Sequence, residues 1–560
     1  MSATNDARGG ELPRLTPELL RTADARLRAR GVDVPGDMVL DLPERVLQFG
    51  TGMMLRGLVE DFIDRANRKG VFQGRIVAVG STNSVTRDRA LNEQGGLYTL
   101  VVRGAESGTL HSAQSAAGMA RTTGTAPAVS MPAPARPASP RALGAAAGID
   151  RRIVTSLSRA LSADEQWDEV LVCARDPALE VIFSQETDAG IVLDETDRPD
   201  LAPPRSFPGK LTRVLLERAR AFRFDRVHAP VVIPCEMVEG NGDRLRAIVL
   251  ELTRRWQLEP EFAAWLERWV PFCNTLVDRI VTSGAPRPEE QAGVAAELGY
   301  EDRVVTTCEP YRLLVIEAGL DMWPRLRFVG ADPGIVLAED IRPFRERKVR
   351  ILNGTHTVAA PVGLLCGCET VLEAIRHPLV GPFLRRVLFD EILPTLDAPG
   401  AEQFAYDVLE RFSNPEIKHF LFDISFQETT KLRGRVLPSI DRFADRSGLA
   451  PASLAFAFGA YLLFTRGELQ QARRARGLEV PGDAEGEPVR AAWAEFGAER
   501  IPELVAAVCG NDELWGIDLR AVYGFVPAVA EALSTMVRDG VPAALEAHLA
   551  AVGAVPPLSR

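Results

Sequence analysis

The sequence predicts an α/β protein in two parts: an N-terminal region built on a mostly parallel sheet, then an all-helical region. Two observations predict this arrangement. Up to about residue 340, short apolar runs alternate with amphipathic helical runs, which is the pattern of a parallel α/β sheet. After about Ile341 the strand signals disappear, and Ala- and Leu-rich helical segments are separated by Pro and Gly breaks.

Individual strands are predicted from apolar runs that are bounded by turn residues. The glycines that follow the first of these strands lead into a helix predicted to extend to about Arg68. The predicted strands cover residues 45–49, 75–80, 97–102, 181–183 and 231–233.

Length and composition narrow the class of protein. The chain has 560 residues and a mass of 61.0 kDa. Because domains contain roughly 150 residues on average, this length predicts two to four domains. The net charge of −11 argues against nucleic acid or an anionic membrane as a partner. Seven scattered cysteines and six dispersed histidines give neither a disulfide framework nor zinc-ligand spacing. We therefore expect a reduced, cytoplasmic enzyme without a metal.

Two segments depart from this globular pattern. Residues 105–148 consist largely of Ala, Ser, Thr, Gly and Pro, so they are predicted to form a mobile surface insertion without a core. Residues 447–465 carry no charge, but a turn and a helix start occupy their first part. The apolar remainder is too short to cross a bilayer, so we predict a buried core helix there.

A glycine turn follows the strand at 45–49. Gly50-Thr51-Gly52 lies where a strand turns into a helix, a place where backbone can approach a pyrophosphate. Leu55 replaces the third glycine of the common fingerprint, so a simple strand–helix turn remains an alternative. The candidate cofactor-binding residues are Phe49, Gly50, Thr51, Gly52, Met53 and Ser81.

The end of the next strand bears on the choice of dinucleotide. A dinucleotide-binding fold usually places an acidic residue there, on the adenosine ribose. Here Ser81 follows Gly80, and no acidic residue occurs between Asp64 and Asp88. Arg87 is near enough in sequence to allow a phosphorylated cofactor. These residues alone leave NAD and NADP open.

A basic run at 342–357 carries the strongest catalytic signal. On an α-helix at about 100° per residue, Asn353 would lie about 140° from Lys348 and His356 about 80° from it. A partly desolvated lysine among arginines has a lowered pKa suited to proton transfer, and an asparagine can donate to a developing oxyanion. The alternative is a solvated basic helix face. The neighbouring arginines are Arg345, Arg347 and Arg350.

The spacing Lys348-x4-Asn353-x2-His356 resembles the signature of the mannitol dehydrogenase family, the long-chain, metal-independent polyol dehydrogenases. The resemblance extends from about Glu44 to at least Pro438, interrupted by the insertion. Within the family, the chain is most similar to the reductases of keto-hexuronates. Further matching segments are 91–100, 206–212, 234–236, 272–280 and 411–419.

This resemblance implies a Rossmann-type dinucleotide-binding domain over 1–340, a helical substrate and catalytic domain over 341–560, and a site between them. It implies NAD as cofactor and Lys348 as general acid/base. Asn274 and Asn353 would hold the reacting oxygen, and His356 would orient the substrate. Without the resemblance, a helix- or turn-capping role would be the better interpretation of Asn274.

The implied reaction is the reduction of the keto group of a hexuronate-type keto acid, and the reverse oxidation. The substrate carboxylate needs a cationic partner. Spacing does not choose among Arg411, Lys418, His419 and Lys431. The alternatives are a different keto-hexuronate, a neutral polyol, or a catalytically silent relative. The segment 184–191 differs from the family pattern at Gln185, Glu186 and Asp188, which bears on the exact substrate.

Overall fold

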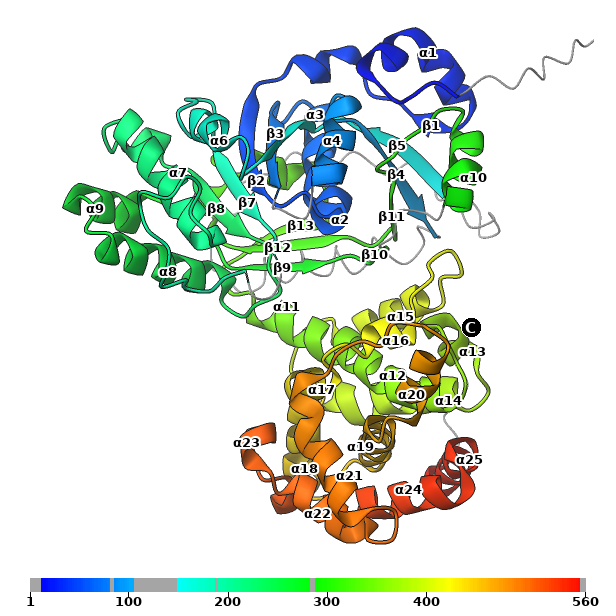
Figure 1. Ribbon diagram of the computed structural model, residues 1–560. Coiled ribbons are helices and arrows are strands. Elements are labelled where there is room, and N and C mark those ends of the chain that lie inside the picture. The colour runs from blue at the N-terminus through cyan, green and yellow to red at the C-terminus, as the bar shows by residue number, and fades with distance from the viewer. Residues whose placement is uncertain (1–11, 81–84, 105–148, 187–189, 283–287, 554–560) are drawn as a thin grey trace, which may run out of the picture. The chain divides into compact units, whose positions relative to one another are not determined.

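The computed structural model describes residues 12–80, 85–104, 149–186, 190–282 and 288–553 (Figure 1). The chain divides into two compact units, Met1–Ile341 and Arg342–Arg560. Three sequence predictions fall outside the described residues: the insertion at 105–148, Ser81 and Asp188.

A five-stranded parallel sheet forms the centre of unit 1. Its strand order is β6-β3-β2-β7-β8, and each neighbouring pair is parallel. Numbered along the chain within this sheet, the order is 3-2-1-4-5, that of a Rossmann-type dinucleotide-binding fold. The prediction of a mostly parallel α/β sheet is therefore confirmed. The strands are β2 (Glu44–Phe49), β3 (Arg75–Gly80), β6 (Leu157–Ser162), β7 (Val181–Ser184) and β8 (Val231–Pro234).

Among the described residues of unit 1 there are two further sheets, a five-stranded one with the order β1-β5-β4-β11-β10 and a three-stranded one with the order β13-β12-β9. The strand predicted at 97–102 is β4 and belongs to the first of them. Sequence reasoning missed β5 and β6 because Arg151, Arg152 and Arg159 interrupt their apolar pattern. The remaining strands are β1 (Val32–Asp33), β4 (Tyr98–Arg103), β5 (Ile149–Val154), β9 (Thr275–Asp278), β10 (Val281–Thr282), β11 (Thr306–Cys308), β12 (Leu313–Glu317) and β13 (Ile335–Ala338).

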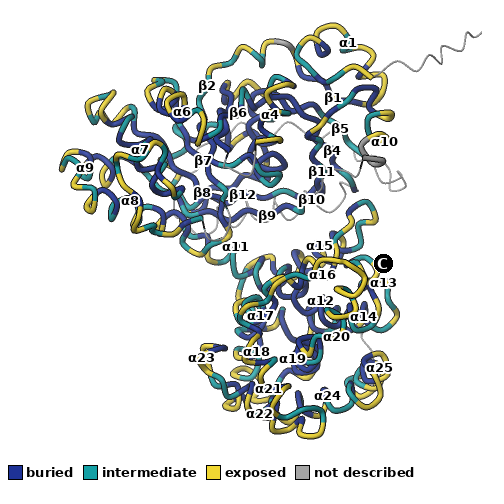
Figure 2. Tube along the Cα trace, in the orientation of Figure 1, coloured by how far each residue is buried: buried dark blue, intermediate teal, exposed yellow. Residues whose placement is uncertain are grey.

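The central sheet is buried on both faces, as Figure 2 shows by its dark strands. Leu47 and Phe49 of β2 pack into a cluster with residues of α6 to α9, whereas Val46 packs into a second cluster with α3. Because side chains alternate along a strand, successive residues of β2 serve opposite layers. The helices of unit 1 are α1 (Pro17–Ala29), α2 (Met53–Leu55), α3 (Asp61–Arg68), α4 (Val85–Glu93), α6 (Trp167–Ala174), α7 (Phe207–Ala221), α8 (Asn241–Arg255), α9 (Pro260–Trp269) and α10 (Pro288–Leu298).

The described residues of unit 2 form helices and no named strand, which confirms the predicted helical region. These helices are α11 (Arg342–Arg347), α12 (Thr355–Leu365), α13 (Val371–Arg376), α14 (Val380–Arg386), α15 (Ala401–Phe412), α16 (Leu421–Ile424), α17 (Glu428–Arg435), α18 (Leu437–Ser447), α19 (Ala452–Thr465), α20 (Glu468–Ala475), α21 (Glu487–Phe496), α22 (Ile501–Cys509), α23 (Asp512–Trp515), α24 (Phe525–Asp539) and α25 (Val541–Val552).

The uncharged segment at 447–465 contains the core helix of unit 2. Nearly every residue of α19 is buried, as predicted. Gly459 brings α19 close to α24, since a Cβ there would lie 3.4 Å from the backbone nitrogen of Leu533. Among the described residues, no helix has the length and apolar character needed to cross a membrane.

Three stretches that continue α-helices are π-helical: Arg56–Glu60, Lys348–Gly354 and Val387–Ile392. In a π-helix the backbone hydrogen bonds join residues five apart. The second stretch therefore corrects the angles predicted for an α-helix. Lys348 and Asn353, which are five residues apart, lie nearly one above the other rather than about 140° apart. π-Bulges are frequent at functional sites.

Candidate functional site

The glycine turn after β2 lies at the carboxyl end of the parallel sheet, where open α/β sheets bind their ligands. Gly50 has φ +103°, and a Cβ there would lie 2.8 Å from the carbonyl oxygen of Gln185. Gly57 takes over the close-packing role of the missing third glycine. A Cβ on Gly57 would lie 2.8 Å from Cγ2 of Val281.

Two arginines fix Thr51, the residue between the glycines. Arg56 Nη1 donates to the Thr51 carbonyl oxygen (3.0 Å), and Arg87 donates to Thr51 Oγ1 from Nε (3.1 Å) and Nη2 (2.8 Å). Sequence reasoning considered Arg87 but missed Arg56, which is buried and also donates to Thr306 Oγ1 (3.0 Å). The turn is therefore held from both sides by cations.

A polar group beneath the turn supports it from the sheet side. Gln48 Nε2 donates to the Gly50 carbonyl oxygen (3.0 Å) and to Glu60 Oε1 (2.9 Å). Both side chains are buried. Burial raises the pKa of the Glu60 carboxyl, although Gln48 and Arg56 act in the opposite direction. No sequence pattern predicted this pair, since Gln48 and Glu60 are twelve residues apart, on a strand and on a π-helix.

The turn after β7 packs on the glycine turn. The backbone nitrogen of Gln185 donates to the Phe49 carbonyl oxygen (3.0 Å). Glu236, which is buried, accepts from Ser184 Oγ (3.2 Å) and from the backbone nitrogen of Glu186 (3.1 Å). Burial raises the pKa of both glutamates. The divergent residues Gln185 and Glu186 thus border the candidate cofactor site.

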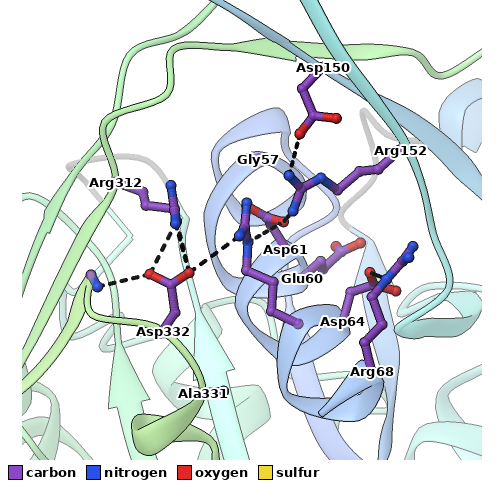
Figure 3. A network of polar contacts seen from close by, with 12 residues as sticks. Gly57, Glu60, Asp61, Asp64, Arg68, Asp150, Arg152, Arg312, Ala331 and Asp332 are labelled. Carbon is purple, nitrogen blue, oxygen red and sulfur yellow. Dashed lines mark hydrogen bonds and ion pairs between the residues drawn. The ribbon is translucent and has the colours of Figure 1, made fainter. Parts of the chain in front are cut away.

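Ion pairs anchor the helix that follows the glycine turn (Figure 3). Asp61 is fully buried and accepts from Arg65 (3.0 Å), Arg152 (3.2 Å) and Arg279 (2.7 Å). Burial alone would raise the pKa of the Asp61 carboxyl, but these arginines hold it well below its usual value. Asp332 joins the network through Arg65 (3.4 Å).

Asn274 follows Cys273 at the start of β9, and its side-chain contacts are those of a helix cap. Its Oδ1 accepts from the backbone nitrogen of Asp243 in the first turn of α8 (3.0 Å). Its Nδ2 donates to Asp243 Oδ2 (2.9 Å) and Glu317 Oε2 (2.7 Å). The amide predicted to hold a reacting oxygen thus lies between two carboxylates, and its catalytic role stays a prediction.

Lys348 begins the π-helical stretch of unit 2 and is 9% exposed. Arg347 and Arg350 are also buried, so this run is not a solvated basic helix face. Arg350 Nη1 donates to Ser439 Oγ (3.1 Å), and burial lowers its pKa to about 10. Asn353 is half-buried.

His356 lies among aromatic rings and cations of unit 2. Its ring stacks on Phe412 at a centroid distance of 4.1 Å and meets the His419 ring edge-on at 4.8 Å. Its Nε2 is buried without a hydrogen-bond partner among the described residues. Burial, followed by the charges of His419, Arg411 and nearby cations, holds the pKa of His356 well below its usual value. His356 is therefore neutral at pH 7.

The candidate cations for the substrate carboxylate differ in their surroundings. Arg411, at the end of α15, is buried and acts on both His356 and His419. Lys418 is exposed and is absent from the groups that shift either histidine. We call Arg411, Lys431 and Arg435 the cationic cluster; His419 lies beside it as a neutral ring, since its pKa is lowered to about 4.

Arg435 was missed by sequence reasoning, although a signal for it was present. Glu428, Lys431 and Arg435 recur on one face of α17 at helical spacing. The Glu428 carboxyl is buried, and both its oxygens lack hydrogen-bond partners among the described residues. Burial raises the pKa of Glu428. Because this carboxyl resists ionisation, it compensates the cationic cluster poorly.

The residues of unit 1 fit a dinucleotide. The backbone at Gly50 is open where a Cβ would collide, and the order of the parallel strands reverses between β2 and β7, beside this turn. No group of three or more His, Cys, Asp or Glu side chains among the described residues is placed to hold a metal ion. The fold and the turn together define a dinucleotide-dependent oxidoreductase of the Rossmann type.

Comparisons with known proteins give the family. Residues 44–323 match the mannitol dehydrogenase Rossmann domain, and residues 340–537 match the mannitol dehydrogenase C-terminal domain. The chain belongs to the mannitol dehydrogenase family. It is thus a dehydrogenase that acts on CH–OH groups with a nicotinamide cofactor.

Curated relatives cover nearly the whole chain. The altronate oxidoreductase of Bacillus subtilis (strain 168) is 35% identical over 512 residues, which cover 91% of this chain and 96% of that protein. The altronate oxidoreductase of Pectobacterium atrosepticum is 37% identical over 513 residues, covering 90% and 97%. A solved structure of Pseudomonas fluorescens mannitol 2-dehydrogenase with NAD and D-mannitol has the same fold, with a TM-score of 0.69 at 19% identity, covering 95% of this chain and 99% of that one.

Proposed function

We propose that this protein interconverts tagaturonate and altronate, a keto-hexuronate and its hydroxy acid, with NAD as cofactor. The observation that carries the proposal is the cationic cluster around His356, because a buried positive site favours an anionic substrate over a neutral polyol. The similarity to altronate oxidoreductases over about nine tenths of both chains supports the same substrate.

Lys348 is proposed as the general acid/base. It donates a proton to the substrate oxygen during reduction and accepts one during oxidation. When bound, the nicotinamide would supply the hydride as NADH and take it up as NAD⁺. Asn274 and Asn353 are proposed to donate amide hydrogens to the reacting oxygen, which lowers the cost of the negative charge that develops there. For Asn274 this requires that Nδ2 give up its hydrogen bond to Asp243 or to Glu317. The π-helical register supports this for Asn353, since it lies on the same side of the helix as Lys348.

His356 is proposed to orient the substrate. As a neutral imidazole with a free Nε2, it can donate to or accept from a substrate hydroxyl. Arg411 of the cationic cluster and the neighbouring His419 are proposed to bind the substrate at its carboxylate end, the arginine as charge partner and the neutral histidine as hydrogen-bond partner. Lys418, also predicted to bind substrate, has less support because it is exposed.

The cofactor is proposed to lie on Phe49, Gly50, Thr51, Gly52 and Met53, with Ser81 at the ribose. NAD rather than NADP is supported by the family resemblance. We place the reaction in the cytoplasm, which the seven free cysteine thiols support.

A substrate panel tests the proposal. Turnover of NADH and NADPH is measured with tagaturonate, fructuronate, fructose and a no-substrate control. The expected result is a kcat/KM for tagaturonate with NADH well above every other combination. A preference for fructuronate or for the neutral ketose would show that the proposed substrate is wrong. Absence of turnover with all three compounds would indicate a catalytically silent relative.

A further inference from the structure

Arg87 is placed at the glycine turn by an unusual contact. It lies in the first turn of α4, the helix after β3, and its side chain reaches across to Thr51. Both Nε and Nη2 donate to the same hydroxyl oxygen, at 3.1 and 2.8 Å. That geometry fixes the guanidinium plane beside the turn, while Nη1 takes no part in the contact. About a third of the side chain remains exposed, so a ligand can reach it.

The charges around Thr51 are incompletely balanced by carboxylates. Among the described residues, the only carboxylate oxygen within ion-pair distance of Arg87 belongs to its neighbour Asp88, at the 4.0 Å limit. The hydrogen bonds of Arg56 go to Thr51 and Thr306, and neither partner is charged. The pKa of Arg56 is lowered, first by burial; the charge of Glu60 acts against this shift, and the charge of Arg87 adds to it.

Two guanidinium groups that approach one residue repel each other, and an anion between them relieves that repulsion. The pyrophosphate of a dinucleotide lies on the glycine turn of a Rossmann-type fold, which is the place that both arginines reach. Arg87 presents an accessible, planar donor set, which suits phosphate oxygens. We propose that Arg87 binds the pyrophosphate of the cofactor, with Arg56 adding positive charge from the buried side of the turn.

This inference rests on the proposed use of a nicotinamide dinucleotide and is independent of the sugar substrate. Dissociation constants of NADH and NADPH are measured by quenching of protein fluorescence, without any sugar present. Adenosine and ADP-ribose are measured by competition against NADH. Arg87→Ala is expected to weaken NADH, NADPH and ADP-ribose alike, by roughly 10- to 100-fold, and to leave adenosine unchanged.

Three further variants separate charge from structure. Arg87→Lys keeps the charge without the planar contact and is expected to weaken NADH less than Arg87→Ala. Thr51→Val removes the anchoring hydroxyl at nearly constant volume and is also expected to give an intermediate loss. Arg89→Ala removes an exposed arginine two residues along the same helix and is expected to leave NADH binding unchanged.

The inference is overturned if Arg87→Ala binds NADH as the parent does, or if adenosine binding falls as much as ADP-ribose binding. It is equally overturned if the loss is confined to NADPH, because the guanidinium would then bind the 2′-phosphate. A parent protein that binds neither dinucleotide would refute the proposed cofactor instead. A wrong sugar assignment alters none of these dissociation constants.

Discussion

The two units use buried charge in opposite ways. In unit 1, the carboxylate of Asp61 accepts from three arginines, so charge meets opposite charge inside the protein. In unit 2, the charges of Arg411, Arg435 and Lys431 lower the pKa of His356, and burial raises the pKa of the nearby Glu428 carboxyl to about 8. The first arrangement places cations around a carboxylate, whereas the second places cations around a neutral ring.

This difference separates a structural role from a ligand-binding role. Asp61 of α3 binds Arg152 of β5 and Arg279 at the end of β9, and Arg65 of α3 binds Asp332, which precedes β13 (Figure 3). These contacts fix the helix that follows the glycine turn. A network of matched charges has nothing to offer a ligand. The cationic cluster lies around His356, whose Nε2 has no hydrogen-bond partner among the described residues. The variants below test this distinction.

The largest effect is expected at Lys348, beside the cationic cluster. Lys348→Ala should lower kcat by roughly 10²- to 10⁴-fold, the usual contribution of general acid–base catalysis. Lys348→Arg should be nearly as slow, because a guanidinium keeps the charge but cannot give up its proton. Single-turnover kinetics measure the chemical step, and the NADH dissociation constant should not change. An active arginine variant would show that the lysine supplies only charge.

The next effect concerns the stability of unit 1. Asp61→Asn should lower the free energy of unfolding by about 3–5 kcal/mol, because it leaves buried arginines without their carboxylate. Asp24→Asn is the matched control, since Asp24 and Arg28 form an exposed pair with the same i,i+4 spacing at 2.7 Å. Asp24→Asn should lower the free energy of unfolding by no more than about 1 kcal/mol. Urea unfolding measures both, and equal losses would contradict a stabilising role for the network.

Sequence reasoning predicted the parts of the fold that repeat a simple period. Apolar runs identified β2, β3, β4, β7 and β8, and the glycines located the turn, although the apolar strands β12 and β13 were not predicted. The strands β5 and β6 escaped because their arginines serve long-range contacts, such as that of Arg152 with Asp61. No local pattern shows that such a polar residue is paired, since its partner lies far away in the sequence.

The candidate site followed the same rule. The spacing of Lys348, Asn353 and His356 was visible, but the π-helical register that aligns the first two was not. A π-helix depends on tertiary packing rather than on propensity, so an α-helical angle was the natural expectation. Thr51 was a candidate from the motif alone. Its contact with Arg87 became evident only when α4 and the glycine turn were placed side by side, and its contact with Arg56 depends on the backbone of the π-helical stretch that follows the turn.

A smaller effect is expected from the histidines of unit 2. Burial, with Arg411 and Lys431, lowers the pKa of His419 to about 4. Between pH 6.5 and about 4 the unfolded chain takes up a proton that the folded protein excludes, so stability falls as the pH falls. The titration of His419 alone should lower the free energy of unfolding by up to about 3 kcal/mol across that pH range. His419→Asn should flatten the curve of unfolding free energy against pH, whereas an unchanged slope would contradict a neutral His419.

The smallest effect is expected when Arg411, at the end of α15, is compared with Lys418, which follows that helix. Arg411 is buried beside His356, while Lys418 is exposed and outside the cationic cluster. Arg411→Ala should raise KM for the keto-hexuronate by roughly 10- to 100-fold, because a charge-assisted contact to a carboxylate is lost. Turnover of a neutral ketose, however slow, should hardly change.

Lys418→Ala should alter KM by no more than about twofold, as expected for a surface substitution. Arg411→Lys is the control for a folding defect. It keeps the charge, so its KM for the keto-hexuronate should lie between those of the parent and of Arg411→Ala. Steady-state kinetics with the keto-hexuronate and the neutral ketose measure all three variants. If Lys418→Ala carried the loss and Arg411→Ala did not, the substrate carboxylate would bind at the exposed loop. The positive potential at His356 would then need a different explanation.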